Sequence, residues 1–274
     1  MFRKKIVSFC FALASASALC VAHAQVNTPA IGPGLSKLSA YHLKLENGGA
    51  LLVLGTSHTH NPDDPQVKEI EEQFGAFAPT EVLVEGGKWP VAATKYEAVA
   101  RYGEMGLAYY LAKHQAVPAG DADPEFSAEI QHVVSVHGAE MSKLFYVLRM
   151  LAQFREESDP TPLDTKIERW LKNPEFEKIA AFKGIIETLP ELDVAARQYV
   201  PSVSWRDVKL GFSDAQKNTP EFDAIARTST EFRDKFLTSL LVEKLLAGKR
   251  VLVVVGLAHL DAQRAAVIPA LRAK

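Results

Sequence analysis

The segment LLVLGTSHTH, from Leu51 to His60, places four apolar residues ahead of a glycine, hydroxyl side chains and two histidines. This pattern predicts a short buried strand with polar groups where the strand ends. Near the other end of the chain, VLVVVGLAHLD repeats the arrangement from Val251 to Asp261. Each segment carries a G-x-x-H motif directly after its apolar run. The pair therefore predicts two buried strands of one sheet, with a histidine beyond the end of each.

Segments between these two add further strands and helices. YHLKLENGGALLVLG (41–55) has two runs around an Asn-Gly-Gly turn, which predicts a β-hairpin. A helix is predicted from apolar residues at helical spacing, namely Val67, Ile70, Phe74 and Phe77. EVLVEGG (81–87) reads as a buried strand with Glu85 at its carboxyl end, GLAYYLAKHQ (106–115) as a helix, and AVPAGDAD (116–123) as a further strand.

From about residue 124 to residue 248 the pattern changes to long helical segments, broken at DPTP, NPEF and YVPS. RVLVVVG (250–256) then supplies a last strand and AHLDAQRAAVIPALRAK (258–274) a closing helix. We therefore expect an α/β fold whose mixed or parallel sheet comes from the two chain ends, with a large helical insertion between them. Residues 25–274 are expected to form a single domain.

The first 24 residues have the layout of a cleavable signal peptide. Basic residues at positions 3–5 precede an apolar stretch and an Ala22-His23-Ala24 site. We expect cleavage after Ala24 and a periplasmic or secreted mature protein. The chain has two cysteines, Cys10 and Cys20, and both lie in this segment, so the mature chain has no thiol to offer a metal.

The charge pattern narrows the choice of partners. The net charge of the whole chain is −2, and removing three basic residues with residues 1–24 makes it about −5, with both signs well mixed. Nucleic acid is therefore not expected as a partner. No later apolar stretch approaches the roughly 20 residues of a membrane helix, so no stable membrane span is expected. A small molecule or a peptide is the expected substrate.

The strongest candidates for chemistry lie where the predicted strands end. In open α/β sheets, sites form beyond the carboxyl ends of the strands, so His58, Glu85 and His259 are expected to meet there. The glycine in each G-x-x-H motif allows a tight turn or a close approach. Glu85 is a candidate metal ligand or general base, with a pKa raised by partial burial. The alternatives are helix-start histidines bonded to backbone and a turn-forming glutamate.

Several other polar residues leave two interpretations open. Arg233 and Asp234 lie on a predicted helix, where the arginine either steadies an oxyanion or belongs to an exposed charge pair. Asp121 and Asp123 either bind a cation or start a helix. His60 is either a third ligand or faces solvent. Packing or surface roles are expected for the remaining histidines of the mature chain, which are His42, His114, His132 and His137.

Taken together, these motifs resemble the TraB/TIKI family (TraB/GumN-like), within the wider group of erythromycin-esterase-like, ChaN-like and TIKI proteins. The resemblance covers about residues 48–123 and 227–262. It implies that His58, Glu85, His259 and Arg233 with Asp234 share one pocket. Asp121 and Asp123 resemble a family D-x-D motif, but Ala122 stands where an arginine is expected. Relatives include metal-dependent peptidases, hydrolases thought not to need metal, and haem-binding proteins.

The leading hypothesis is an exported hydrolase, either metallopeptidase-like or esterase-like. In the metal-dependent version His58, Glu85 and His259 hold Mn, Co or Zn, and Arg233 steadies the oxyanion. In the metal-free version His58 or Glu85 is the general base that activates water. The alternative from another class is a haem-binding or iron-binding protein that uses the same pocket without turnover.

Overall fold

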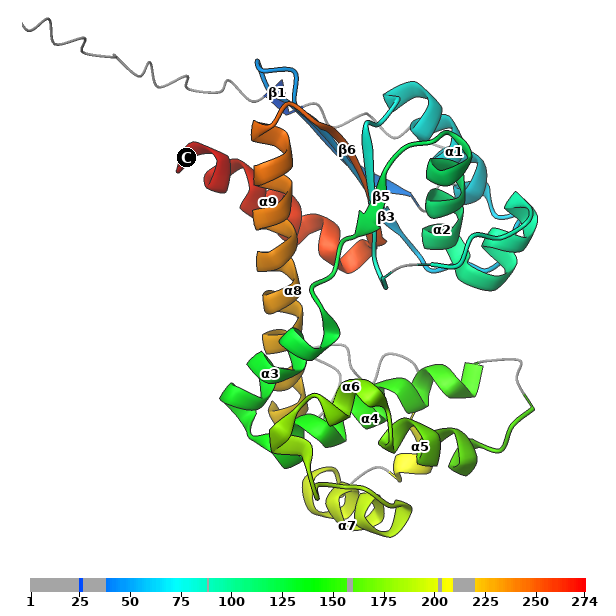
Figure 1. The fold of residues 1–274 in the computed structure, drawn as a ribbon, viewed down its shortest axis with the longest axis vertical. Helices are drawn as coiled ribbons and strands as arrows, with labels where there is room; N and C mark the ends of the chain where they lie inside the picture. Colours follow the sequence, from blue (N-terminus) through cyan, green and yellow to red (C-terminus); the bar gives the residue numbers. More distant parts are fainter. Residues whose placement is uncertain (1–24, 27–37, 88, 157–159, 202–203, 209–219) are drawn as a thin grey trace, which may run out of the picture.

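The computed structural model describes residues 25–26, 38–87, 89–156, 160–201, 204–208 and 220–274. The expected signal peptide, residues 1–24, lies outside the described residues. The described chain forms an α/β unit built on one sheet, with a separate layer of helices beside it (Figure 1).

The sheet has six strands in the spatial order β1-β2-β3-β6-β4-β5. Their bounds are β1 Gln25–Val26, β2 Ser39–Lys44, β3 Ala50–Thr56, β4 Glu81–Val84, β5 Ala119–Asp121 and β6 Arg250–Gly256. β1, β2 and β3 pair antiparallel, whereas β3, β6, β4 and β5 pair parallel. The sheet is therefore mixed, and strands from the two ends of the chain are neighbours in it. This confirms the fold class expected from the sequence.

The apolar runs form the centre of the sheet because helices cover both of its faces. β3 is buried along its whole length, as expected for a central parallel strand packed on both sides. On one face lie α1 (Pro65–Phe77) and α2 (Lys95–His114), and on the other α8 (Pro220–Leu246) and α9 (Leu257–Arg272) (Figure 1). The helix expected from the spacing of Val67, Ile70, Phe74 and Phe77 is α1, and it buries all four side chains.

The insertion is helical, as expected. It contains α3 (Phe126–His137), α4 (Ala139–Glu156), α5 (Leu163–Leu171), α6 (Pro174–Glu177), α7 (Leu189–Tyr199) and the short 3-10 helices η1 (Ala180–Phe182) and η2 (Trp205–Asp207). These helices share a hydrophobic core of their own with the first part of α8. The 27-residue α8 then runs from that core to the sheet (Figure 1). It thereby carries residues of the insertion to the carboxyl ends of the parallel strands.

One helix is longer than the sequence pattern indicated. α2 begins at Lys95, where the Thr94 side chain accepts a hydrogen bond from the Glu97 N–H, and it continues through a kink at Gly103. Gly103 has φ 62° and ψ −156°, a conformation that glycine adopts without steric strain.

Within the described part of the chain, no helix combines the length and the apolar character needed to cross a membrane.

Candidate functional site

Polar side chains from distant parts of the chain meet where β3, β4 and β6 end. Glu85 directly follows β4, and its backbone N–H donates to the carbonyl of Val254 in β6 at 3.1 Å. His259 lies in the first turn of α9, and its Nε2 is 3.6 Å from Glu85 Oε1. His58 lies in the loop after β3, and its Nε2 comes close to Gly256. The structure thus brings together the two histidines and the glutamate that the sequence singled out.

The two motif glycines make this meeting sterically feasible, each for residues of the other motif. A Cβ atom on Gly256 would lie 2.5 Å from His58 Nε2 and 3.3 Å from Glu85 Oε2. A Cβ atom on Gly55 would lie 3.1 Å from the Leu257 side chain and 3.3 Å from Leu260 Cβ. β3 and β6 are paired in register, so their ends approach closely, and a side chain larger than glycine at either position would displace its neighbours from the other motif.

Glu85 is the centre of the cluster, and both of its carboxylate oxygens have donors. Oε1 accepts a hydrogen bond from Arg233 Nη2 at 2.7 Å, and Oε2 accepts one from the Gly256 backbone N–H at 2.6 Å. Burial by itself would raise the pKa of Glu85. The adjacent His259 imidazole, the charge of Arg233 and the Gly256 N–H outweigh burial and hold that pKa well below the ordinary range. The expectation of a raised pKa at Glu85 is therefore wrong, because burial alone does not set it.

His259 is enclosed between two carboxylates. Its Nδ1 lies 2.8 Å from Asp234 Oδ1, and its Nε2 faces Glu85. Burial would lower the pKa of the imidazole, but Asp234 and Glu85 raise it to about 9. His259 is therefore protonated at neutral pH, and Nδ1 donates to Asp234. It does start a helix, but its partner is a side chain and not the backbone.

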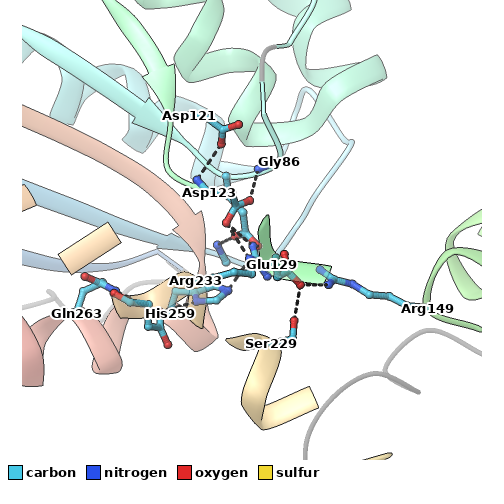
Figure 2. Close-up of polar contacts among 12 residues, drawn as sticks. Gly86, Asp121, Asp123, Glu129, Arg149, Ser229, Arg233, His259 and Gln263 are labelled. Atoms are coloured by element: carbon cyan, nitrogen blue, oxygen red, sulfur yellow. Dashed lines mark hydrogen bonds and ion pairs between the residues drawn. The ribbon is translucent and has the colours of Figure 1, made fainter. Parts of the chain in front are cut away.

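Asp234 is held in turn by a buried amide. Gln263 is fully buried in α9, and its Nε2 donates to Asp234 Oδ1 at 3.1 Å and to the Asp234 carbonyl at 3.2 Å (Figure 2). The Thr238 hydroxyl donates to Gln263 Oε1 at 3.0 Å. Because both the nitrogen and the oxygen of this amide have partners, the Asp234 carboxylate has a fixed orientation toward His259.

Arg233 is buried, with 8% of its surface exposed, so the exposed-charge-pair interpretation of this residue is wrong. Its Nε donates to Asp123 Oδ1 at 2.8 Å, while Nη2 lies 2.8 Å from the same oxygen and 2.7 Å from Glu85 Oε1. Burial would lower the pKa of the guanidinium, but Asp123 and Glu85 raise it. The arginine therefore links two carboxylates and fixes both of them.

Asp123 holds the loop that follows β4, and Asp121, the last residue of β5, holds Asp123. Asp123 Oδ2 accepts from the Gly86 N–H at 2.9 Å, and Asp121 Oδ1 accepts from the Asp123 N–H at 2.8 Å (Figure 2). Gly86 and Gly87 both have positive φ, at 85° and 94°. Burial, followed by the charge of Asp123, raises the pKa of Asp121. The segment leads into α3, but the N-cap residue of that helix is Glu125 and it has no side-chain cap, so neither aspartate caps the helix, and cation binding stays a prediction.

His58 has different surroundings from His259. It is exposed, and its backbone is in the left-handed region, with φ 60°. Such a conformation in a residue other than glycine stores strain, and strain of this kind concentrates at functional sites. His60, which was a candidate third ligand, is also exposed and lies beside Gly103 of α2.

The other four histidines of the part of the chain that the structure describes lie away from the cluster, in packing or surface positions. Their rings contact Phe77 (His42), Tyr110 (His114) and Phe232 (His132), and Thr228 is hydrogen-bonded to His137.

Four buried residues of the site escaped the sequence analysis, namely Gln66, Glu104, Glu129 and Gln263. Glu129, in α3 of the helical insertion, accepts hydrogen bonds from Tyr146 and Ser229 at 2.9 and 2.6 Å, and Figure 2 shows it beside Arg233. For the two glutamates, the available signal was a lone charged residue in an apolar helical stretch. Glu104, for example, lies in the segment GEMGLAYY.

The donor set fits a divalent metal poorly. The Arg233 guanidinium already occupies the position of a cation beside Glu85 Oε1, and Oε2 is engaged by the Gly256 N–H. A protonated His259 has no lone pair for a metal, since imidazole ligates in its neutral form. Among the described residues, no group of three or more His, Cys, Asp or Glu side chains is arranged to hold a metal ion. We therefore assign no step to a metal, and the metal-dependent hypothesis stays a prediction.

Comparison of the chain with protein-family models, with curated proteins and with solved structures gives no match. The resemblance to the TraB/TIKI family therefore depends on the residues named above.

Proposed function

We propose that this protein is a hydrolase of esters or amides in which His58 is the general base that activates water. The observation that carries the proposal is the state of His58. It is an exposed imidazole in a strained backbone conformation, held against the buried ionic cluster at the sheet edge. Imidazole is the side chain best suited to accept and return a proton near neutral pH.

Glu85 would assist His58 as a fixed negative charge. His58 Nε2 and Glu85 Oε2 both lie close to the position that a Cβ atom on Gly256 would take, at 2.5 and 3.3 Å from it. The imidazole and the carboxylate are therefore near each other. When His58 takes a proton from water, the carboxylate stabilises the resulting imidazolium. The lowered pKa of Glu85 supports this role, because the group then stays anionic at every pH at which the base works. It also speaks against Glu85 as the base itself.

Arg233, His259 and Asp234 would hold Glu85 in place. The cations neutralise the buried carboxylates on the inner side of the cluster and leave His58 on the outer, exposed side. The reaction is ordinary hydrolysis. Water loses a proton to His58 as its oxygen attacks the substrate carbonyl, and His58 returns the proton to the leaving alcohol or amine.

His58→Ala tests the proposal, with His60→Ala as the matched control. Both residues are exposed histidines of one loop, so neither change should alter the fold. We expect His58→Ala to lower kcat by about 10²- to 10⁴-fold, and His60→Ala to leave it nearly unchanged. The measurement uses p-nitrophenyl esters of increasing chain length together with a fluorogenic peptide panel. Equal activity of His58→Ala and the wild type would remove His58 as the base.

Gly256→Ala displaces His58 without changing its chemistry. The added methyl group would collide with His58 Nε2, so we expect a loss of activity while the histidine is still present. Because Gly256 has φ −59°, alanine adopts this backbone without strain. Full activity in Gly256→Ala would contradict the placement of His58 in the reaction.

Two further measurements separate the alternative functions. Hydrolysis that survives thorough chelation supports the metal-free version, and hydrolysis restored by Mn, Co or Zn supports the metal-dependent one. A Soret band on haem titration, with no turnover of any ester or peptide, would support the ligand-binding alternative. From the signal-peptide pattern we propose that this hydrolysis takes place outside the cytoplasm. From the paired G-x-x-H motifs we propose that the protein is a member of the TraB/TIKI family.

A further inference from the structure

The strained backbone of His58 is anchored on both sides by buried side chains. The left-handed conformation at φ 60° is unfavourable for a residue with a Cβ atom, so the surroundings must stabilise it. Ser57 and Thr59 flank His58, and each donates its backbone N–H to a side chain of a different helix. The loop is therefore fixed at two points, with the histidine between them.

Gln66, in the first turn of α1, is the first anchor. It is completely buried, its Oε1 accepts from the Ser57 N–H at 3.1 Å, and its Nε2 donates to Ser57 Oγ at 2.6 Å. Its own backbone N–H donates to the capping residue Asp64 at 3.0 Å. Because the amide of Gln66 acts as donor and acceptor toward one residue, it fixes both the position and the orientation of Ser57.

Glu104, in α2, is the second anchor. It is 1% exposed, and its Oε1 accepts from the Thr59 N–H at 2.8 Å. The kink at Gly103 brings α2 close to the loop, since a Cβ atom on Gly103 would lie 3.1 Å from the Thr59 carbonyl oxygen. Burying a carboxylate is unfavourable, and a neutral side chain would hold an ordinary surface loop equally well. A buried glutamate whose carboxyl group binds the Thr59 N–H therefore indicates that the position of this loop is functionally important.

We infer that Gln66 and Glu104 are positioning residues that set the His58 imidazole against Gly256 and Glu85 for proton transfer. This inference rests on the proposed function of His58. A shift of the imidazole by about 1 Å is enough to lower a catalytic rate by about 10²-fold. Neither side chain is exposed to a substrate, so both act only through the loop.

The decisive variants are Glu104→Leu, which removes the acceptor, and Glu104→Gln, which keeps an oxygen for the Thr59 N–H. We expect Glu104→Leu to lower kcat by about 10- to 100-fold with little change in KM, and Glu104→Gln to restore most of the activity. In a His58→Ala background, Glu104→Leu should cause no further loss. A purely structural role predicts equal losses in both backgrounds, and that result would overturn the inference.

A second measurement does not depend on turnover. Carbethoxylation of His58 by diethyl pyrocarbonate, read by peptide mass spectrometry, reports the accessibility of the imidazole. We expect the rate at His58 to rise in Glu104→Leu and to stay unchanged at the neighbouring His60. An unchanged rate at His58 would overturn the positioning role. If His58→Ala were fully active while this rate still changed, the proposed function would fail and the geometric part of the inference would stand.

Ser57→Ala keeps the inference testable should Glu104→Leu fail to fold. It removes the hydroxyl group of an exposed residue, and Gln66 Nε2 still has Asp64 Oδ1 at 3.4 Å as an acceptor, so folding should not suffer. We expect a loss of kcat smaller than that of Glu104→Leu, because the Ser57 N–H still binds Gln66. Unchanged kcat and unchanged carbethoxylation in Ser57→Ala would count against Gln66 as an anchor.

Discussion

His58 and His259 follow neighbouring parallel strands, each three residues after a glycine, yet their imidazoles have different surroundings. His259 is 8% exposed and lies in the first turn of α9, between Asp234 and Glu85. His58 is exposed and lies in a loop, in a left-handed backbone conformation that is unfavourable for residues other than glycine. The same four-residue motif thus yields a buried cation in one place and an exposed imidazole in the other. The difference arises because β6 leads directly into a helix, whereas β3 leads into a loop.

A fully buried glutamine supports each motif. Gln263 in α9 holds the carboxylate partner of His259, whereas Gln66 in α1 holds the backbone next to His58. The first arrangement fixes a charge and the second fixes a conformation. The motif ending in His259 therefore belongs to the buried part of the site, and the motif ending in His58 presents the exposed imidazole to which the proposed function assigns the reaction.

The largest expected contrast concerns stability. Arg233→Met leaves the partly buried carboxylates of Glu85 and Asp123 without their common cation, so we expect a loss of about 3–5 kcal/mol in the free energy of unfolding. His58→Ala removes an exposed side chain and should change this free energy by less than about 0.5 kcal/mol. Urea unfolding followed by circular dichroism measures both. Equal midpoints for Arg233→Met and the wild type would show that the cluster contributes nothing to stability.

A triple variant tests the cause of that loss. Adding Glu85→Gln and Asp123→Asn to Arg233→Met removes the uncompensated charges, so part of the lost stability should return. A further decrease in place of recovery would mean that the cavity left by the arginine, and not unpaired charge, dominates.

The second contrast concerns pH. The pKa of His259 is raised from 6.5 to about 9, so the folded chain keeps a proton that the unfolded chain loses above pH 6.5. The stabilisation from His259 is complete below that pH and is lost as the pH rises through about 9, by roughly 3 kcal/mol. Urea midpoints at pH 6.5 and pH 9.5 should therefore differ more in the wild type and in His58→Ala than in His259→Gln. The same pH dependence in all three proteins would contradict the assignment of the proton to His259.

Elements whose shape is set by local pattern were predictable from the sequence. β3 and β6 are continuous apolar runs, and α1 has apolar residues at helical spacing, so their identity follows from neighbours in the chain. The convergence of His58, Glu85 and His259 was predictable as well, because the carboxyl ends of parallel strands lie at one edge of a sheet.

The electrostatic state of the site was not predictable, because it depends on partners far away in the chain. Whether Glu85 has a raised or a lowered pKa depends on His259 and on Arg233, and even the nearer of these two, Arg233, is 148 residues further on. The roles of Gln66 and Glu104 depend on a loop that folds back between two helices, and no spacing rule records such a contact. A polar residue in an apolar helix indicates that it has a hydrogen-bonding partner, but the sequence does not show which residue that partner is.

The smallest expected effect tests the strain at His58 most directly. At φ 60° glycine is favoured over alanine, so His58→Gly should be more stable than His58→Ala by about 1 kcal/mol. At His60, which does not have a positive φ, the order should reverse, and His60→Gly should be less stable than His60→Ala by about 0.5–1 kcal/mol. Both His58 variants should lack activity, because the proposed function requires the imidazole. His58→Gly would thus relieve backbone strain and lose function at the same position. Four urea unfolding curves decide the matter, because the sign of the glycine–alanine difference, and not its size, carries the result. The same sign at both positions would mean that His58 is unstrained, and the two anchors would then have no strain to oppose.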